Sequence, residues 1–223
     1  AGHLLFLRET TLMAQPFDAQ RLQLTGEAFP VAEQIQTHSP GELHGNFSVS
    51  ENGVLVYQTG TSAGGSQLTW FDRTGKQIGV LGDPAPYGDV WLSPDGKRVS
   101  VSIPSGSTRD IWVYDVARGL KTRFTFDTTD ERAPIWSPDS SRIVVNSNRK
   151  GHFDLYLKPA SGAGTEEVLL EDKIDKYPMS WSADGRFFLY RTGNTAPLDL
   201  FVLPLFGDRK PVPFLQTKFT KNN

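Results

Sequence analysis

One short stretch of the sequence matches a motif that performs nucleophilic catalysis. Residues 60–64 read GTSAG, which fits the G-x-S-x-G pattern whose serine attacks an acyl carbon. That chemistry requires a strand before the serine and a helix after it, so that a sharp turn exposes the hydroxyl. Here the motif runs into GSQLTWFD, which has the composition of a β-strand. We therefore expect Ser62 to lie in a flexible hairpin loop without a catalytic role.

Metal-binding patterns are equally weak. The chain has no cysteine and four histidines, none of which form a closely spaced zinc-binding pair. They are His3, His38, His44 and His152. An aspartate recurs at Asp110, Asp154 and Asp199, but side chains at one place in successive segments do not readily converge on one ion. A short aspartate that accepts backbone N–H bonds where a strand starts explains them better. We predict no catalytic residue, no metal and no cofactor.

Composition excludes further classes. The 223 residues carry a net charge of −2 and a pI of about 6.1, whereas nucleic-acid-binding domains usually show a basic stripe or a pI above roughly 9. No apolar run approaches the ~20 residues needed to cross a bilayer, so we predict no membrane insertion of this region. The first residues, AGHLLFLRETTL, lack the features of a signal peptide. The 21 glycines and 15 prolines indicate many turns.

The elements that must position any site come from an internal repeat. WLSPDG at 91–96, IWSPDS at 135–140, SWSADG at 180–185 and a weaker FSVSENG at 47–53 are copies of one pattern. Their serines are 43, 44 and 45 residues apart, and an aliphatic residue that opens a strand follows each serine by 18 residues. The serines are Ser50, Ser93, Ser137 and Ser182. Four short strands per unit of about 44 residues predict an all-β propeller of four-stranded antiparallel blades.

The repeated turn has a structural explanation. Proline presets φ, aspartate bonds the local backbone, and glycine adopts a left-handed conformation without steric cost. The motif therefore predicts the tight hairpin between the first and second strands of a blade. Trp91, Trp136 and Trp181 recur beside it, so we expect them to pack between blades.

The repeat resembles a known one, the WD40-like (PD40) repeat of TolB-like β-propellers. The resemblance lies in the pattern WSPDG-[KR] followed by D-[IL]-[WY]-V, and the segment at 147–156, SNRKGHFDLY, resembles the second hairpin of that repeat. The segment at 4–35 also resembles propeller regions attached to bacterial, notably acidobacterial, serine/threonine protein kinases. The repeat divides the chain into a partial blade (1–37), four blades (38–82, 83–126, 127–171 and 172–217) and the start of another (218–223). Since TolB-like rings usually have six blades, we expect a fragment of a six-bladed ring.

Positions that repeat should be scaffold, and positions that differ between copies are where function could lie. In propellers, the loops between blades share one face with the loops between second and third strands, around a central channel. The polar and aromatic residues that these loops carry are the candidate ligand- or partner-binding residues. They are Tyr87, Asp89, Arg109, Asp130, Glu131, Arg132, Arg149, His152, Asp175, Lys176 and Tyr177.

Two functions fit these features. The first is a non-enzymatic module that binds a protein or peptide, as the sensor or interaction domain of a larger bacterial protein such as a membrane-anchored serine/threonine kinase. The resemblance implies a periplasmic or otherwise extracytoplasmic location for it. The alternative is an accessory gating propeller of a prolyl-oligopeptidase-like or tricorn-like peptidase, whose hydrolase would lie elsewhere in the chain. The sequence of the parent gene would separate the two.

Overall fold

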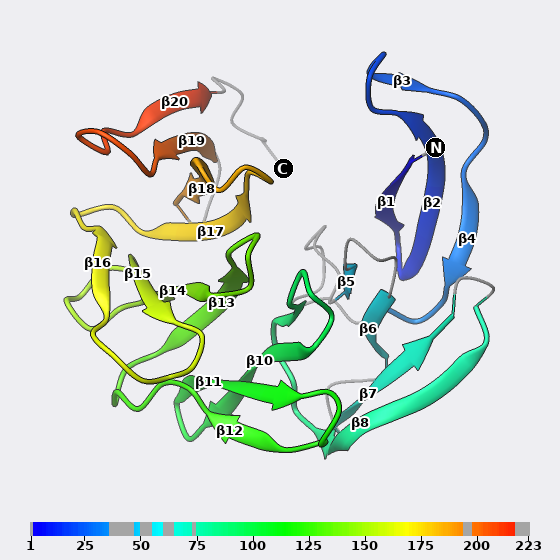
Figure 1. The fold of residues 1–223 in the computed structure, drawn as a ribbon, viewed down its shortest axis with the longest axis horizontal. Helices are drawn as coiled ribbons and strands as arrows, with labels where there is room; N and C mark the ends of the chain where they lie inside the picture. Colours follow the sequence, from blue (N-terminus) through cyan, green and yellow to red (C-terminus); the bar gives the residue numbers. More distant parts are fainter. Residues whose placement is uncertain are drawn as a thin grey trace.

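The computed structural model describes residues 2–35, 47–49, 55–59, 65–72, 75–193 and 198–216. Their strands form five four-stranded sheets, and every strand pair is antiparallel. In Figure 1 the sheets follow one another in chain order around a common centre, as the blades of a propeller do. We number them blades 1 to 5. The described part of the chain holds no helix that is long and apolar enough to cross a membrane.

Each blade is a run of four consecutive strands. Blade 1 contains β1 (Gly2–Arg8), β2 (Thr11–Asp18), β3 (Gln23–Leu24) and β4 (Phe29–Ala32). Blade 2 contains β5 (Phe47–Val49), β6 (Leu55–Thr59), β7 (Ser66–Phe71) and β8 (Gln77–Ala85). Blade 3 contains β9 (Val90–Leu92), β10 (Arg98–Ser105), β11 (Thr108–Asp115) and β12 (Lys121–Arg123). Blade 4 contains β13 (Glu131–Trp136), β14 (Arg142–Ser147), β15 (Asp154–Pro159) and β16 (Glu167–Leu170). Blade 5 contains β17 (Lys176–Trp181), β18 (Phe187–Thr192), β19 (Asp199–Pro204) and β20 (Val212–Leu215).

The blade count corrects the predicted architecture. The propeller and its four-stranded antiparallel blades are confirmed, but the structure has five blades, and the prediction of a fragment of a six-bladed ring is wrong. The difference arises in blade 1, where β3 and β4 both pair with β2, with Leu24 opposite Phe17 and Ala32 opposite Leu12. Two short strands thus share one position beside β2 and complete a four-stranded sheet. A count based on Ser-Pro-Asp-Gly turns takes residues 1–37 for only part of a blade, because this sheet contains no such turn.

The repeated turn is the hairpin that the sequence predicts, between the first and second strands of blades 3, 4 and 5. In blade 3 the Ser93 hydroxyl donates to the Asp95 carboxylate at 2.5 Å and accepts the backbone N–H of Arg98 at 2.9 Å. Gly96 has a φ of 71°, in the left-handed region. Ser137 and Ser182 make the same pair of bonds in the next two blades. The motif recurs because each of these hairpins needs the same local bonds.

Apolar layers between successive blades form the core. The layer between blades 3 and 4 includes Ile111, Trp136, Ile143 and Tyr156, all buried. Trp136 is 4% exposed, and its indole N–H donates to Ser100 Oγ at 2.9 Å and to the Trp91 carbonyl at 3.2 Å, both in blade 3. This confirms that Trp136 packs against the neighbouring blade.

Two of the three recurring aspartates have structural partners. Asp110 and Asp154 are buried, and Asp110 accepts a hydrogen bond from the Arg123 guanidinium at 2.8 Å. Asp154 accepts the backbone N–H of Asp172 at 3.1 Å and the ammonium of Lys176 at 2.8 Å. Both carboxylates therefore tie together neighbouring segments of the propeller.

Candidate functional site

A row of alternating cationic and aromatic side chains lies where β13 and β17 begin. The Arg132 guanidinium is 5.2 Å from the ring centre of Phe153, and that ring centre is 5.7 Å from the ring centre of Tyr177. The Arg191 guanidinium lies 4.2 Å over the Tyr177 ring. All four side chains are partly exposed and come from blades 4 and 5. We call Arg132, Phe153, Tyr177 and Arg191 the aromatic row. Its partly exposed guanidinium groups and tilted rings offer cation–π and apolar contacts to a partner.

The carboxylates of Asp130 and Asp175 hold the row in position. Asp130 is buried and accepts hydrogen bonds from two nitrogens of Arg132, with Nε at 2.7 Å. Asp175 accepts the backbone N–H of Phe153 at 2.9 Å, and its carboxylate lies 3.6 Å from Nδ1 of the half-exposed His152. These contacts fix both the guanidinium of Arg132 and the loop that carries Phe153. The row is therefore preorganised for binding.

Lys176 begins β17 but does not face a ligand. Its side chain is fully buried, and its ammonium lies 2.8 Å from both Asp154 and Asp172 and 2.7 Å from the carbonyl of Ile174. Three acceptors match the three donors of an ammonium group. Lys176, which directly precedes Tyr177 in the sequence, thus joins blade 5 to the third strand of blade 4.

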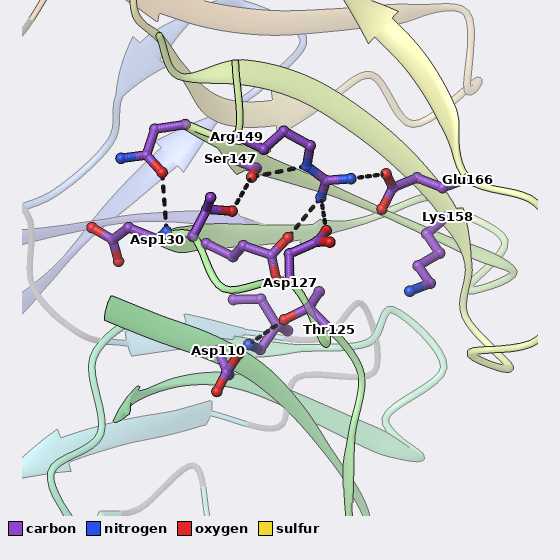
Figure 2. A network of polar contacts seen from close by, with 12 residues as sticks. Asp110, Thr125, Asp127, Asp130, Ser147, Arg149, Lys158 and Glu166 are labelled. Carbon is purple, nitrogen blue, oxygen red and sulfur yellow. Dashed lines mark hydrogen bonds and ion pairs between the residues drawn. The ribbon is translucent and has the colours of Figure 1, made fainter. Parts of the chain in front are cut away.

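Arg149 is the centre of a second polar cluster, between blades 3 and 4. Figure 2 shows its guanidinium between Glu166 and Ser147, with Asp127 close by. It lies 2.8 Å from Asp127, 2.7 Å from Glu131 and 2.5 Å from Glu166, and Nε donates to Ser147 Oγ at 3.1 Å. We call these five residues the Arg149 network. Three carboxylates around one guanidinium leave the network with a net negative charge.

Glu131 is the most constrained member of the network. Its side chain is fully buried, and its Oε2 atom has no hydrogen-bond partner. Burial raises the pKa of this carboxyl above its ordinary value, although Arg149 acts in the opposite direction. The ring of Tyr156 packs 4.1 Å below the Arg149 guanidinium. The network therefore supports the blade junction.

Three candidates lie away from the row. Tyr87 is buried in the core, where its hydroxyl bonds to the Tyr114 hydroxyl at 2.8 Å and burial raises its pKa. The Asp89 carboxylate accepts the Ser102 hydroxyl and the backbone N–H of Ala133, both at 3.0 Å, and so links blades 3 and 4. Arg109 is partly exposed in β11, opposite Pro104.

The structure also adds residues that the sequence analysis did not select. Phe153 stands one residue before a recurring aspartate, where blade 3 has Arg109, so the search for differences between copies could have found it. Arg191 lies within β18, where a search restricted to loops cannot reach. Asp127 and Glu166 are charged residues in connecting segments, and no sequence signal distinguishes them from ordinary surface charges.

The described residues give no support to a catalytic serine or to a metal site. Ser62, His38 and His44 lie outside the described residues. The segment after GTSAG forms β7, so the helix that a nucleophile elbow requires is replaced by a strand. Among the described residues, no three side chains of the metal-binding types are placed to share an ion.

Comparison with known proteins identifies the family. Residues 84–205 match the family model of the TolB β-propeller domain (PD40), and the chain belongs to this family. An uncharacterized protein of Agrobacterium fabrum is 27% identical over 160 residues, which cover 71% of this chain and 54% of that protein. The chain thus spans about half the length of this curated relative.

Solved structures show the same fold. A putative TolB from Agrobacterium tumefaciens superposes with a TM-score of 0.74 at 18% identity, covering 95% of this chain and 76% of that one. TolB from Acinetobacter baumannii gives a TM-score of 0.71 at 19% identity, with 97% and 52% covered. At these identities the similarity concerns the fold alone. It agrees with the resemblance drawn from the turn motif.

Proposed function

We propose that the chain is a non-enzymatic binding module whose aromatic row engages a protein or peptide partner. The observation that carries the proposal is the contrast between repeated and unrepeated positions. The turn serines, Trp136 and the buried aspartates recur and hold the blades together, whereas Arg132, Phe153, Tyr177 and Arg191 occur once and are partly exposed. Aromatic and arginine side chains are also the types that dominate binding energy in protein interfaces.

The remaining candidate residues fall into three groups in this proposal. Asp130, His152 and Asp175 flank the row and position its arginine and its loop. The junctions between blades beside the row are stabilised by Glu131, Arg149 and Lys176. Tyr87 is buried in the core, whereas Asp89, just before β9, and Arg109, on β11, are partly exposed and would contact only a partner that extends beyond blades 4 and 5.

The cellular context belongs to the same proposal. The resemblance of residues 4–35 to kinase-attached propellers supports a sensor domain of a larger bacterial protein, exposed outside the cytoplasm. The rival, a gating propeller of a peptidase, predicts an α/β-hydrolase in the parent chain. The binding-module proposal predicts a kinase domain and a membrane-spanning segment there, so the parent gene distinguishes them.

Site-specific photo-crosslinking tests the binding role. A photoreactive amino acid replaces Tyr177 in the full chain, and in a control it replaces Ile78, which is 62% exposed on β8 of blade 2. In an extract of the source cells, we expect a discrete cross-linked product from position 177 and none from position 78. The product should weaken when Arg132→Ala and Arg191→Ala are added. Equal products from both positions, or none from position 177, would refute the proposal.

A further inference from the structure

Arg132, at one end of the aromatic row, has its charge balanced while part of its side chain stays exposed. The buried Asp130 carboxylate accepts hydrogen bonds from two nitrogens of its guanidinium, with Nε at 2.7 Å. Such bonds lie in the plane of the guanidinium and therefore leave its flat faces uncovered. One face is directed to the ring of Phe153, whose centre is 5.2 Å away. The side chain of Arg132 is 38% exposed, which leaves room for a contact with a partner.

The charge balance disfavours an anionic ligand at this position. A carboxylate of the partner would bring a second negative charge close to that of Asp130, which already neutralises the guanidinium. The flat face of the group is still suited to an aromatic ring, because a guanidinium is planar, weakly hydrated and attracted to the face of an aromatic ring. Stacking also leaves the hydrogen bonds to Asp130 intact.

Other cations of the propeller show that one cationic group can contact two rings. Three such side chains outside the row each lie within 6.0 Å of two ring centres. They are Lys121 with Trp112 and Tyr114, Lys158 with Phe124 and Phe126, and Arg186 with Phe187 and Phe206. Among the described residues, Arg132 contacts the single ring of Phe153.

Two other arginines that contact one ring use their remaining surface inside the protein. Arg149 stacks on Tyr156, but four polar side chains surround its guanidinium and its side chain is 21% exposed. Arg98 stacks on Trp136 and donates to two backbone carbonyls of blade 4. Arg132 has no such enclosure.

We propose that the aromatic row binds an aromatic residue of its partner, whose ring stacks on the exposed face of the Arg132 guanidinium. This inference rests on the proposed function, because it names the residue type that the row recognises. The residues next to that aromatic residue lie against Phe153 and Tyr177, which are both partly exposed.

Arg123 provides an internal reference for this proposal. Its side chain is 36% exposed, pairs with the buried Asp110 at 2.8 Å and lies 5.4 Å from the ring centre of Phe126. Arg123 and Arg132 thus have similar exposure and similar partners. Beyond Phe153, however, Arg132 has the ring of Tyr177 in the same row, whereas Phe126 is flanked by the ammonium of Lys158.

Nuclear magnetic resonance of the arginine Nε–H groups in the full chain tests the proposal. The probes are the peptides acetyl-Gly-Trp-Gly-amide, acetyl-Gly-Leu-Gly-amide and acetyl-Gly-Glu-Gly-amide. A ring stacked on the guanidinium shields the Nε–H proton, so we expect the tryptophan peptide to shift the Arg132 signal upfield and saturably. We expect it to bind about threefold more tightly than the leucine peptide, as an exposed cation–π contact provides. The Arg123 signal should move less at the same peptide concentration.

Two matched variants make the test specific, with affinities measured from the resonances of the peptides themselves. Arg132→Lys keeps the charge but removes the planar group, so it should bring the tryptophan peptide to the affinity of the leucine peptide. Arg123→Lys should leave the preference for tryptophan unchanged.

Four results would overturn the proposal: an unmoved Arg132 signal, equal affinities of the tryptophan and leucine peptides for the wild type, equal shifts of the Arg123 and Arg132 signals, or tighter binding of the glutamate peptide. If position 177 still cross-links to a partner in any of these cases, the binding function stands and its recognition of an aromatic residue is refuted.

Discussion

Replacing Arg149 by leucine removes the only counter-charge that Glu131 has among the described residues. The Glu131 side chain is fully buried, and that of Arg149 is 21% exposed. Leaving a buried charge without its partner costs about 3–5 kcal/mol. Asp127 is half exposed, so the loss of its pair with Arg149 adds only about 0–1 kcal/mol. Because Arg149 still reaches solvent, we expect a loss near the lower bound, about 3 kcal/mol.

Urea unfolding measures this loss, with Arg118→Leu as the matched control. Arg118 is exposed and its side chain makes no hydrogen bond or ion pair with the described residues, so its replacement should change the free energy of unfolding by no more than about 0.5 kcal/mol. Adding Glu131→Gln to Arg149→Leu should restore most of the loss, because the amide carries no charge to bury. A loss below about 1 kcal/mol, or a double variant as unstable as the single one, would refute this account of the network.

Four further outcomes follow from the same structure. Burial raises the pKa of the Glu131 carboxyl above 4.5, so the protonated carboxyl stabilises the folded state below that pH, and this stabilisation declines as pH rises through the folded pKa. The stability of Glu131→Gln relative to wild type should therefore increase from pH 4 to pH 7 in urea melts. A constant difference would contradict this. Trp136→Ala should cost about 3–5 kcal/mol in the same assay, and a loss below about 1 kcal/mol would show that the side chain is not core. The Ser140 hydroxyl accepts the Asp95 N–H at 3.1 Å, so Ser140→Ala should cost about 1 kcal/mol of unfolding free energy. Ser140 also has a φ of 59°, and Ser140→Gly should be nearly neutral because glycine relieves about 1 kcal/mol of backbone strain and so offsets the lost hydrogen bond. Equal losses for the two variants would argue against this explanation. Ser62→Ala should leave labelling by a fluorophosphonate probe unchanged, and labelling of the wild type alone would establish a nucleophile.

The fold was largely accessible from the sequence because a propeller repeats its local chemistry. The bonds of Ser93 to Asp95 and to the Arg98 backbone recur in two later blades, and such repetition is visible without a structure. The complete sheet of blade 1 could not be predicted in this way. Its sheet is completed by β3 and β4 on one side of β2, and no turn motif marks that pairing.

The candidate site was only partly accessible, because a sequence shows charges but not their partners. Glu131 and Lys176 were expected in loops of the channel face, yet they begin β13 and β17 with their side chains fully buried. Each is buried because a distant segment supplies the opposite charge. The aromatic row likewise depends on contacts between blades 4 and 5, and no spacing within one repeat reports them.

The central claim is that unrepeated positions bind and repeated positions stabilise. Its most direct test compares the affinity of the cross-linked partner for Tyr177→Ala and for Ser182→Ala. The Ser182 hydroxyl makes the local bonds of a repeated turn. We expect Tyr177→Ala to weaken binding at least about tenfold, as loss of an aromatic hot spot does, and Ser182→Ala to leave the affinity unchanged. Equal affinities for the two variants, or a larger loss for Ser182→Ala, would contradict the claim.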